Sequence, residues 1–291
     1  MFVRLIKKRD GVWMYLEKEA IDYFKNYDLK ESFLMKLSNK PEGFFSSRRI
    51  GSSAEFEEYK EYVPSDNLKD LDWKKYARTQ KLLVRQYESY AHSRIYFFLD
   101  ISNSMNFPTR RLSKLEYSKK FIAIFSYLLL KNQNEVYFVA IGERSPTEIR
   151  IHYDNIEKVL AGVEIEKRFH YSNLLKIKAD GIAFLISDGW WGKDFQSVID
   201  ILVSKKINFF QVLSAEEIDF PYRDFSEFID SEKGSKVSVD ISNFSRIYRK
   251  RMTERINMFY DRFSNYSLYY YTMNDKIPYY HSLKNFLDIA V

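Results

Sequence analysis

Two short segments of the sequence carry oxygen-bearing side chains at spacings that could bind a metal ion. Residues 100–104 read DISNS, so the carboxylate of Asp100 is followed at alternate positions by the hydroxyls of Ser102 and Ser104. A tight loop can direct these three side chains toward one centre. A carboxylate with hydroxyls suits a hard cation such as Mg²⁺ (or Mn²⁺), which takes oxygen ligands and retains several waters. This spacing therefore predicts a metal site built from oxygen ligands.

Two further residues could complete the coordination. Asp188 follows the apolar run GIAFLIS, and Ser172 opens a helix predicted before that run. In an open α/β sheet, ligands bind beyond the carboxyl ends of the strands, where the strand order reverses. We therefore expect Asp188 to add a second carboxylate through water, Ser172 to add a third hydroxyl, and all five side chains to converge. The alternative is that DISNS is a turn whose side chains bond to their own backbone.

The composition of the 291-residue chain disfavours several other classes of site. It has no cysteine and only four histidines, which excludes thiol chemistry and disfavours soft-metal centres. The 46 basic and 40 acidic residues give a net charge of +6, a surplus too small to indicate a nucleic-acid-binding face. No stretch reaches the roughly 18 apolar residues of a membrane span. The N-terminal residues are charged where a signal peptide needs an apolar core, so we expect a cytoplasmic protein.

The elements that must position these side chains alternate between strands and helices. Short apolar runs, typical of strands buried on both faces, are predicted at 94–100, 135–141, 181–189 and 208–214. Helices are predicted between them, notably at 113–130, capped by Ser113, and at 195–206. An edge strand is predicted at 148–153. This alternation predicts an α/β fold, a doubly wound, mostly parallel sheet with helices on both faces.

The chain divides into three segments by pattern. Residues 1–90 are predicted to form an N-terminal extension, loop-rich over 46–80, with a strand at 82–90. Residues 91–214 carry the α/β core. Residues 215–291 are predicted to complete the same unit with a hairpin at 227–230 and 236–242, a long helix at 243–265, a strand at 267–273 and a closing helix.

The sequence resembles a known family over about residues 30–291. DISNSM resembles the first motif, D-x-S-x-S, of the metal-ion-dependent adhesion site (MIDAS) of von Willebrand factor A-like domains. Residues 55–88, EFEEYKEYVPSDNLKDLDWKKYARTQKLLVRQYE, resemble the signature of the prokaryotic domain-of-unknown-function-58 family, which is von Willebrand factor A-like. The matching positions are Glu55, Phe56, Tyr62, Asp66, Asp72, Trp73, Ala77, Arg78, Asp100, Ser102, Ser104 and Met105. The sequence departs from the pattern at Lys60, Ser65 and Lys69, and Ser172 follows Tyr171 where the usual Thr follows Gly.

The resemblance implies a fold, a role for each site residue and a partner. The fold would be von Willebrand factor A-like, with Ser102, Ser104 and Ser172 binding the metal directly and Asp100 and Asp188 acting partly through water. A cation held largely by neutral hydroxyls keeps an open position that attracts a carboxylate of another protein. Family members resemble adaptors encoded beside MoxR-type AAA+ ATPases. We therefore expect a Mg²⁺-dependent protein–protein interaction adaptor that works with such an ATPase.

Two other functions remain open for the same residues. A metal-dependent, phosphoesterase-like hydrolase would use Asp100 and Asp188 with acidic residues from 66–72. Two-metal hydrolysis, however, needs more carboxylates converging around metals about 4 Å apart, whereas DISNS offers hydroxyls. A metal-free structural subunit would result if the Ser172 loop were misplaced. We therefore favour a role without catalysis.

Trp190 and Trp191 are candidates for partner binding. They follow Asp188 in the sequence SDGWW. They could anchor an interface beside the metal, and packing in the core over the sheet is equally compatible with their position.

A second candidate for partner binding lies in residues 55–78. Asp66, Asp72, Trp73 and Arg78 form a dense acidic and aromatic group there. This group could dock a partner. The favoured interpretation is a buried network in which Arg78 pairs with Asp66 or Asp72 and Trp73 packs on the sheet, because paired charges often fix a loop in place.

Overall fold

The computed structural model describes residues 14–29, 31–38, 55–63, 71–88, 93–107, 112–221, 225–229 and 236–289. Contacts divide the chain into two compact units. One unit is Met1–Asn39 together with Ser93–Val291, and the other is Lys40–His92. The segment boundaries expected after residues 90 and 214 stay a prediction.

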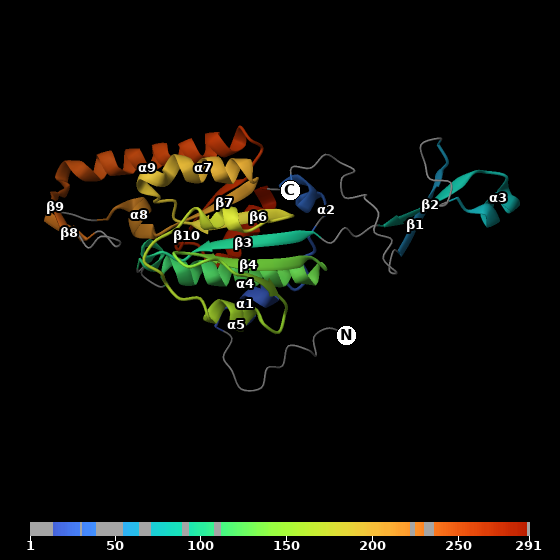
Figure 1. The fold of residues 1–291 in the computed structure, drawn as a ribbon, viewed down its shortest axis with the longest axis horizontal. Coiled ribbons are helices and arrows are strands. Elements are labelled where there is room, and N and C mark those ends of the chain that lie inside the picture. The colour runs from blue at the N-terminus through green and yellow to red at the C-terminus, as the bar shows by residue number, and fades with distance from the viewer. Residues whose placement is uncertain are drawn as a thin grey trace. The chain divides into compact units, whose positions relative to one another are not determined.

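A six-stranded sheet lies at the centre of the larger unit (Figure 1). Its order is β10-β7-β6-β3-β4-β5, and every neighbouring pair is parallel except β4 and β5, which are antiparallel. The strands are β3 (Arg94–Asp100), β4 (Glu135–Ile141), β5 (Glu148–Ile151), β6 (Ile182–Ser187), β7 (Ile207–Leu213) and β10 (Tyr270–Asn274). This arrangement confirms the predicted fold class, an α/β fold with a mostly parallel sheet.

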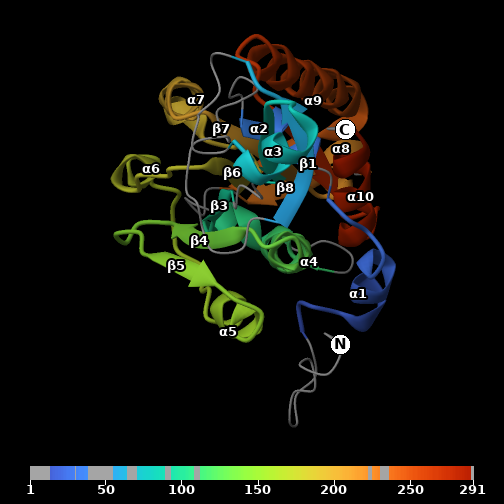
Figure 2. The ribbon, with the colours of Figure 1, turned by 90° about the vertical axis from the view of Figure 1, so that its right-hand side faces the viewer.

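Helices cover both faces of this sheet. In Figure 2, α7 lies on one side of the strands, whereas α4 and α10 lie on the other. Side chains of α7 and α9 share one apolar cluster with Phe98 and Phe209, and side chains of α4 and α10 share another with Phe97 and Phe210. The helices are α1 (Lys18–Phe24), α2 (Glu31–Ser38), α4 (Lys114–Lys131), α5 (Ile156–Ala161), α6 (Asn173–Lys176), α7 (Phe195–Ser204), α8 (Ala215–Asp219), α9 (Ile241–Ser264) and α10 (Tyr279–Ile289).

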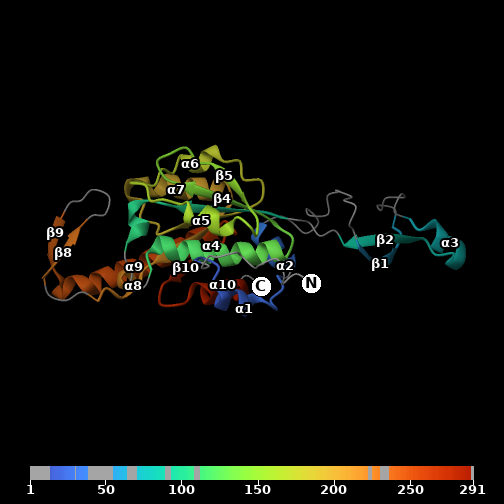
Figure 3. The same ribbon diagram turned by 90° about the horizontal axis from the view of Figure 1, so that it is seen from below.

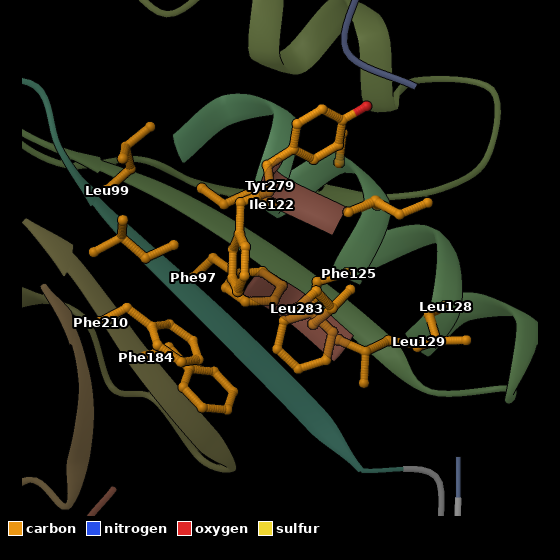
Figure 4. Packing of buried hydrophobic residues seen from close by; sticks show 14 of the residues in the cluster. Phe97, Leu99, Ile122, Phe125, Leu128, Leu129, Phe184, Phe210, Tyr279 and Leu283 are labelled. Carbon is orange, nitrogen blue, oxygen red and sulfur yellow. The ribbon is translucent and has the colours of Figure 1, made fainter. Parts of the chain in front are cut away.

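Aromatic side chains fill the core between the sheet and α4 (Figure 4). Phe184 of β6 stacks on Phe210 of β7 with ring centroids 4.9 Å apart, and Phe97 of β3 lies 5.7 Å from Phe184. Phe286 of α10 meets Phe210 edge to face at 4.7 Å. Because successive residues of a strand point to opposite faces, the adjacent apolar residues of the strands supply both clusters at once. This explains why the strands are continuously apolar.

The strand order reverses at β3. From β3 the chain runs through β4 to β5 on one side, whereas β6, β7 and β10 lie on the other side. Since β3 and β6 are parallel neighbours, their carboxyl ends meet at one edge of the sheet, where α/β folds bind ligands. Asp100 and Asp188 lie at these two strand ends, as the sequence predicts.

A hairpin precedes the long helix of the C-terminal region (Figure 3). Strands β8 (Phe225–Ile229) and β9 (Lys236–Asp240) pair antiparallel, and α9 begins directly after them. The predicted hairpin and helix are therefore present, with boundaries shifted by about two residues. No helix among the described residues is long and apolar enough to cross a membrane.

The smaller unit contains more regular structure than the sequence indicates. Strand β1 (Glu55–Glu61) pairs antiparallel with β2 (Leu83–Glu88), and α3 (Trp73–Thr79) lies between them in the chain. Both β1 and α3 fall in the segment predicted to be loop-rich. The pairing register shifts between Phe56 and Glu58, and such a bulge disrupts the period-two pattern that identifies a strand.

Candidate functional site

Asp100 and Asp188 lie buried at the carboxyl ends of β3 and β6. Asp100 is the last residue of β3 and is 1% exposed, and Asp188, directly after β6, is fully buried. Asp100 Oδ1 accepts a hydrogen bond of 2.9 Å from the backbone N–H of Ser102. Asp100 Oδ2 accepts one of 2.6 Å from the hydroxyl of Ser187. Both carboxylates are thus placed at the point where the strand order reverses.

The surroundings of Asp100 disfavour the ionised form of its carboxyl group. Burial, together with the negative charge of Asp188, raises the pKa of Asp100 to about 7. Hydrogen bonds from Ser187 and Ser102 act in the opposite direction and lower the pKa. A bound cation would favour the ionised carboxylate of Asp100 and relieve its repulsion from Asp188.

Ser102 and Ser104 present their hydroxyls side by side next to Asp100. Ser102 has an extended backbone and occupies the N-cap position of a short 3-10 helix (Asn103–Asn106) without a side-chain capping bond, and its Oγ is hydrogen-bonded to Ser104 Oγ at 3.0 Å. An octahedral Mg²⁺ site with bonds of about 2.1 Å places neighbouring ligand oxygens about 3.0 Å apart. The two hydroxyls therefore have the spacing of adjacent Mg²⁺ ligands, and the donor set fits a hard cation.

Ser172 lies on a loop at the same edge of the sheet. The loop is held there because Glu166 N donates to Ile101 O at 2.7 Å and Asn173 Nδ2 donates to Gly142 O at 2.7 Å. The hydroxyl of Ser172 pairs with His170 Nδ1 at 2.8 Å, and the described contacts do not join it to Asp100 or Ser102. The structure therefore groups Asp100, Ser102, Ser104 and Asp188, and places Ser172 at the same edge in a different hydrogen bond.

Asn173, the neighbour of Ser172, carries an unsatisfied acceptor. Its side chain is almost fully buried, and its Oδ1 has no hydrogen-bond partner among the described residues. A buried amide oxygen without a partner costs free energy, so it favours a donor such as an ordered water.

Lys114 is a residue of this site that the sequence analysis missed. It is the first residue of α4 and is 2% exposed, and its ammonium lies 2.8 Å from Asp188 Oδ2 and 2.8 Å from Glu217 Oε1. Burial alone would lower the pKa of Lys114, but the charges of Asp188 and Glu217 outweigh it and raise the pKa above its ordinary value. A cation is unfavourable at a helix N-terminus. A lysine at the first position of a predicted helix is the one feature of the sequence that could have indicated a role for Lys114.

Ser187 is also part of the site. Its hydroxyl donates to Asp100 Oδ2 and accepts hydrogen bonds from the N–H of Gly189 at 3.1 Å and the indole N–H of Trp191 at 3.2 Å. The fully buried Ser187 therefore connects the two strand ends to the loop that follows Asp188. The SDG motif contains this residue, but nothing in the motif indicates its partner.

The two tryptophans after Asp188 differ in environment. Trp191 is 7% exposed and packs in the core, with ring centroids 5.1 Å from Phe209 and 5.9 Å from Phe259. Trp190 is 39% exposed and stacks under the guanidinium of Arg255 at 4.5 Å. The sequence left both core packing and an interface role open for these residues. Trp191 is a core residue, whereas Trp190 has the exposure that an interface residue needs.

The acidic and aromatic group of residues 55–78 belongs to the smaller unit. Asp72 is buried and caps α3, since its Oδ1 accepts from the N–H of Lys75 at 3.0 Å. Within the smaller unit, Trp73 is 62% exposed, and Arg78 is exposed in the last turn of α3. Asp66 lies outside the described residues. The exposed Trp73 leaves partner binding open for this unit.

The carboxylates near Asp100 do not form a larger cluster of acidic, histidine or cysteine ligands among the described residues. Groups of three or more His, Cys, Asp or Glu side chains able to hold a metal ion are absent from the residues described. The candidate site has two carboxylates and neutral hydroxyls, so it is not a group of this kind. A two-metal hydrolase would need the larger carboxylate cluster.

Comparisons with known proteins give one family match. The model described as "Protein of unknown function DUF58" matches residues 58–257. A solved structure described as the SpRpn10 VWA domain aligns with a TM-score of 0.40 and 9% identity, covering 66% of this chain and 94% of that chain. An uncharacterized membrane spanning protein from Vibrio fischeri aligns with a TM-score of 0.24 and 11% identity, covering 67% and 96%. Structural similarities of this size do not indicate a function. Among curated proteins, the search finds no match.

Proposed function

This chain belongs to the DUF58 family of proteins of unknown function, and we propose that it is a protein-binding module that works through a bound metal ion. The metal would be Mg²⁺ (or Mn²⁺), held by Ser102 and Ser104 with Asp100 and Asp188 acting partly through water. Its open coordination position would capture a carboxylate of a partner protein. Ser172 would join the ligands once its hydroxyl leaves His170.

The observation that carries this proposal is the group formed by Asp100, Ser102 and Ser104. The two hydroxyls lie 3.0 Å apart, which suits adjacent ligands of an octahedral cation. They lie beside a buried carboxylate whose pKa is raised to about 7 by burial and by Asp188. Both features favour a small divalent cation at this position.

The charge balance supports capture of an anion rather than cleavage of a bond. Hydroxyl ligands carry no charge, and Asp188 is already paired with the ammonium of Lys114. A divalent cation would therefore keep excess positive charge at its open position. That charge attracts a carboxylate from another protein, because charge-assisted contacts of this kind are the strong ones.

The identity of the partner is proposed from the family resemblance. Family members resemble adaptors encoded beside MoxR-type AAA+ ATPases, so we propose an ATPase of this type as the partner. Trp190 supplies an exposed aromatic surface beside the buried site, which suits a protein interface.

A metal-dependent pull-down tests the proposed function. The chain is immobilised and offered the purified MoxR-type ATPase of its own organism, with Mg²⁺ or with EDTA. We expect capture with Mg²⁺, loss of capture with EDTA, and loss of capture by Asp100→Ala. Asp154→Ala, which removes an exposed carboxylate, is the matched control and should bind normally. Capture that persists in EDTA would contradict metal-dependent binding.

A further inference from the structure

Lys114 occupies a position where a lysine is costly. Its ammonium is withdrawn from water, since the side chain is 2% exposed, and it lies at the N-terminal end of α4. Both burial and the helix dipole disfavour a positive charge there. Such a side chain is retained only if compensating negative charges hold it. Asp188 and Glu217 supply these charges, each at 2.8 Å from the ammonium.

The side chain of Glu217 is held in place by contacts other than the one with Lys114. Its Oε2 accepts the backbone N–H of Ser214 at 2.7 Å, and its own N–H donates to Ser214 Oγ at 3.1 Å, which forms a capping box at α8. Its Oε1 accepts from Lys114 Nζ and, at 3.3 Å, from the indole N–H of Trp190. The ammonium is therefore held between one carboxylate of the candidate metal site and one carboxylate anchored in α8.

The ammonium and a divalent cation would draw on the same negative charge. Asp188 Oδ2 is the oxygen that Lys114 binds, and Asp188 is one of the two carboxylates proposed to serve the metal through water. A positive charge paired directly with that carboxylate opposes the approach of a second cation, most strongly in a buried, low-dielectric site. Lys114 must therefore weaken metal binding compared with the same site lacking its charge.

We propose that Lys114 is a built-in counter-ion of Asp188 that sets the affinity of the site for a divalent cation. This inference rests on the proposed function, since it concerns the same metal site. It assigns Lys114 a positioning role, acting on the metal through Asp188. It also connects the site to the surface, because the Glu217 oxygen that shares Lys114 also accepts from the exposed Trp190.

Direct titration with Mn²⁺, followed by the electron paramagnetic resonance signal of the free ion, tests the inference. Lys114→Met removes the charge and keeps an unbranched side chain of similar length. We expect it to bind Mn²⁺ at least about tenfold more tightly than the wild type. The matched control is Lys119→Met, which removes another buried lysine of α4 whose partners are Glu116 and the carbonyl of Val163. This control should bind like the wild type.

A second variant covers the possibility that Lys114→Met fails to fold with Glu217 left unpaired. The double variant Lys114→Met/Glu217→Gln removes one positive and one negative charge, and Gln is compatible with a capping box. It should still bind Mn²⁺ several-fold more tightly than the wild type. The lost ammonium is in direct contact with Asp188, so its removal should affect the metal more than the removal of the Glu217 charge, which lies beyond the ammonium. Folding of each variant is checked by circular dichroism, and Mg²⁺ should displace Mn²⁺ from every variant that binds it.

The outcomes separate this inference from the proposed function. If the wild type binds Mn²⁺ and the Lys114 variants bind equally well, the counter-ion role is overturned and the metal site stands. If the wild type does not bind and a Lys114 variant does, the counter-ion role is supported and the proposed function of the natural chain fails. If none of the proteins binds, both are overturned.

Discussion

Asp100 Oδ2 accepts a hydrogen bond of 2.6 Å from the hydroxyl of Ser187, so the last residues of β3 and β6 are joined across the point where the strand order reverses. This contact fixes one oxygen of Asp100. The other oxygen faces the backbone of Ser102. The carboxylate is thus oriented by both neighbours before any metal arrives, which is the preorganisation that a small ion site needs.

Removing the Ser187 hydroxyl should lower the stability of the fold. Ser187→Ala leaves Asp100 without one hydrogen bond and leaves the Trp191 indole N–H without its acceptor. We expect a loss of about 1–3 kcal/mol in the free energy of unfolding, measured by urea titration. Ser126→Ala, which removes a buried hydroxyl without a hydrogen-bond partner among the described residues, should cost much less. Equal losses in the two variants would contradict the role given to Ser187.

The pKa of Asp100 predicts how the stability of the metal-free protein depends on pH. Its folded-state pKa is about 7, raised from an ordinary value of 3.8 by burial and by Asp188. Because the folded state favours the protonated form, the contribution of Asp100 is fully present below about pH 4 and is lost as the pH rises through 7. We expect urea midpoints in EDTA to fall between pH 5 and pH 8, and Asp100→Asn to remove most of that fall. An unchanged slope in Asp100→Asn would exclude Asp100 as its cause.

Metal binding should show the complementary pH dependence. The cation needs Asp100 ionised, so apparent Mg²⁺ affinity should fall as the pH drops below about 7. Saturating Mg²⁺ at pH 8 should stabilise the fold, by about 2.7 kcal/mol at a hundred times the dissociation constant. Thermal unfolding at a series of Mg²⁺ concentrations and pH values measures both effects. Ca²⁺, which prefers more ligands at longer distances, serves as the comparison ion.

Substitution of Ser172 tests whether its hydroxyl is a ligand of the proposed metal ion. If this hydroxyl leaves His170 to bind the metal, Ser172→Ala should weaken Mg²⁺ binding about tenfold. His170→Ala frees the hydroxyl and should leave affinity unchanged or slightly higher. Isothermal titration of Mg²⁺ into both variants measures the difference. Equal affinities of Ser172→Ala and the wild type would remove Ser172 from the ligand set.

Replacing Trp191 with alanine should mainly lower stability, whereas replacing Trp190 should mainly weaken partner binding. Trp191→Ala removes a buried ring packed on Phe209 and Phe259 and should cost about 3–5 kcal/mol of stability. Trp190→Ala removes an exposed ring and should cost less than about 1 kcal/mol, yet weaken capture of the partner. Urea titration and the Mg²⁺-dependent pull-down measure the two effects separately. Normal capture by Trp190→Ala would exclude it as an anchor.

The sequence predicted the sheet and its two acidic strand ends because both depend on local patterns. Continuous apolar runs identify buried parallel strands, and parallel strands bring the residues that follow them to one edge. Asp100 and Asp188 could therefore be placed together without a structure. The hydroxyl pair of Ser102 and Ser104 could be placed beside them because it depends on a single loop.

Residues that depend on distant partners could not be predicted in the same way. Lys114 lies 74 residues from Asp188 and 103 from Glu217 in the chain, and no local pattern identifies such pairs. Trp190 and Trp191 are neighbours in the chain, and the burial of Trp191 depends on packing against distant residues such as Phe209 of β7 and Phe259 of α9. Strand β1 was missed because a register shift breaks its alternation.

The place of α10 and β10 in the core has a consequence for synthesis on the ribosome. Phe286 contacts Phe125, Phe184 and Phe210, and β10 covers the edge of β7. A nascent chain translated only as far as α8 would present these aromatic rings and the unpaired edge of β7 to a chaperone. Cooperative folding of the sheet must therefore wait until residues 270–289 have emerged from the exit tunnel, and ribosome stalling before that point should produce chains that bind holdase chaperones.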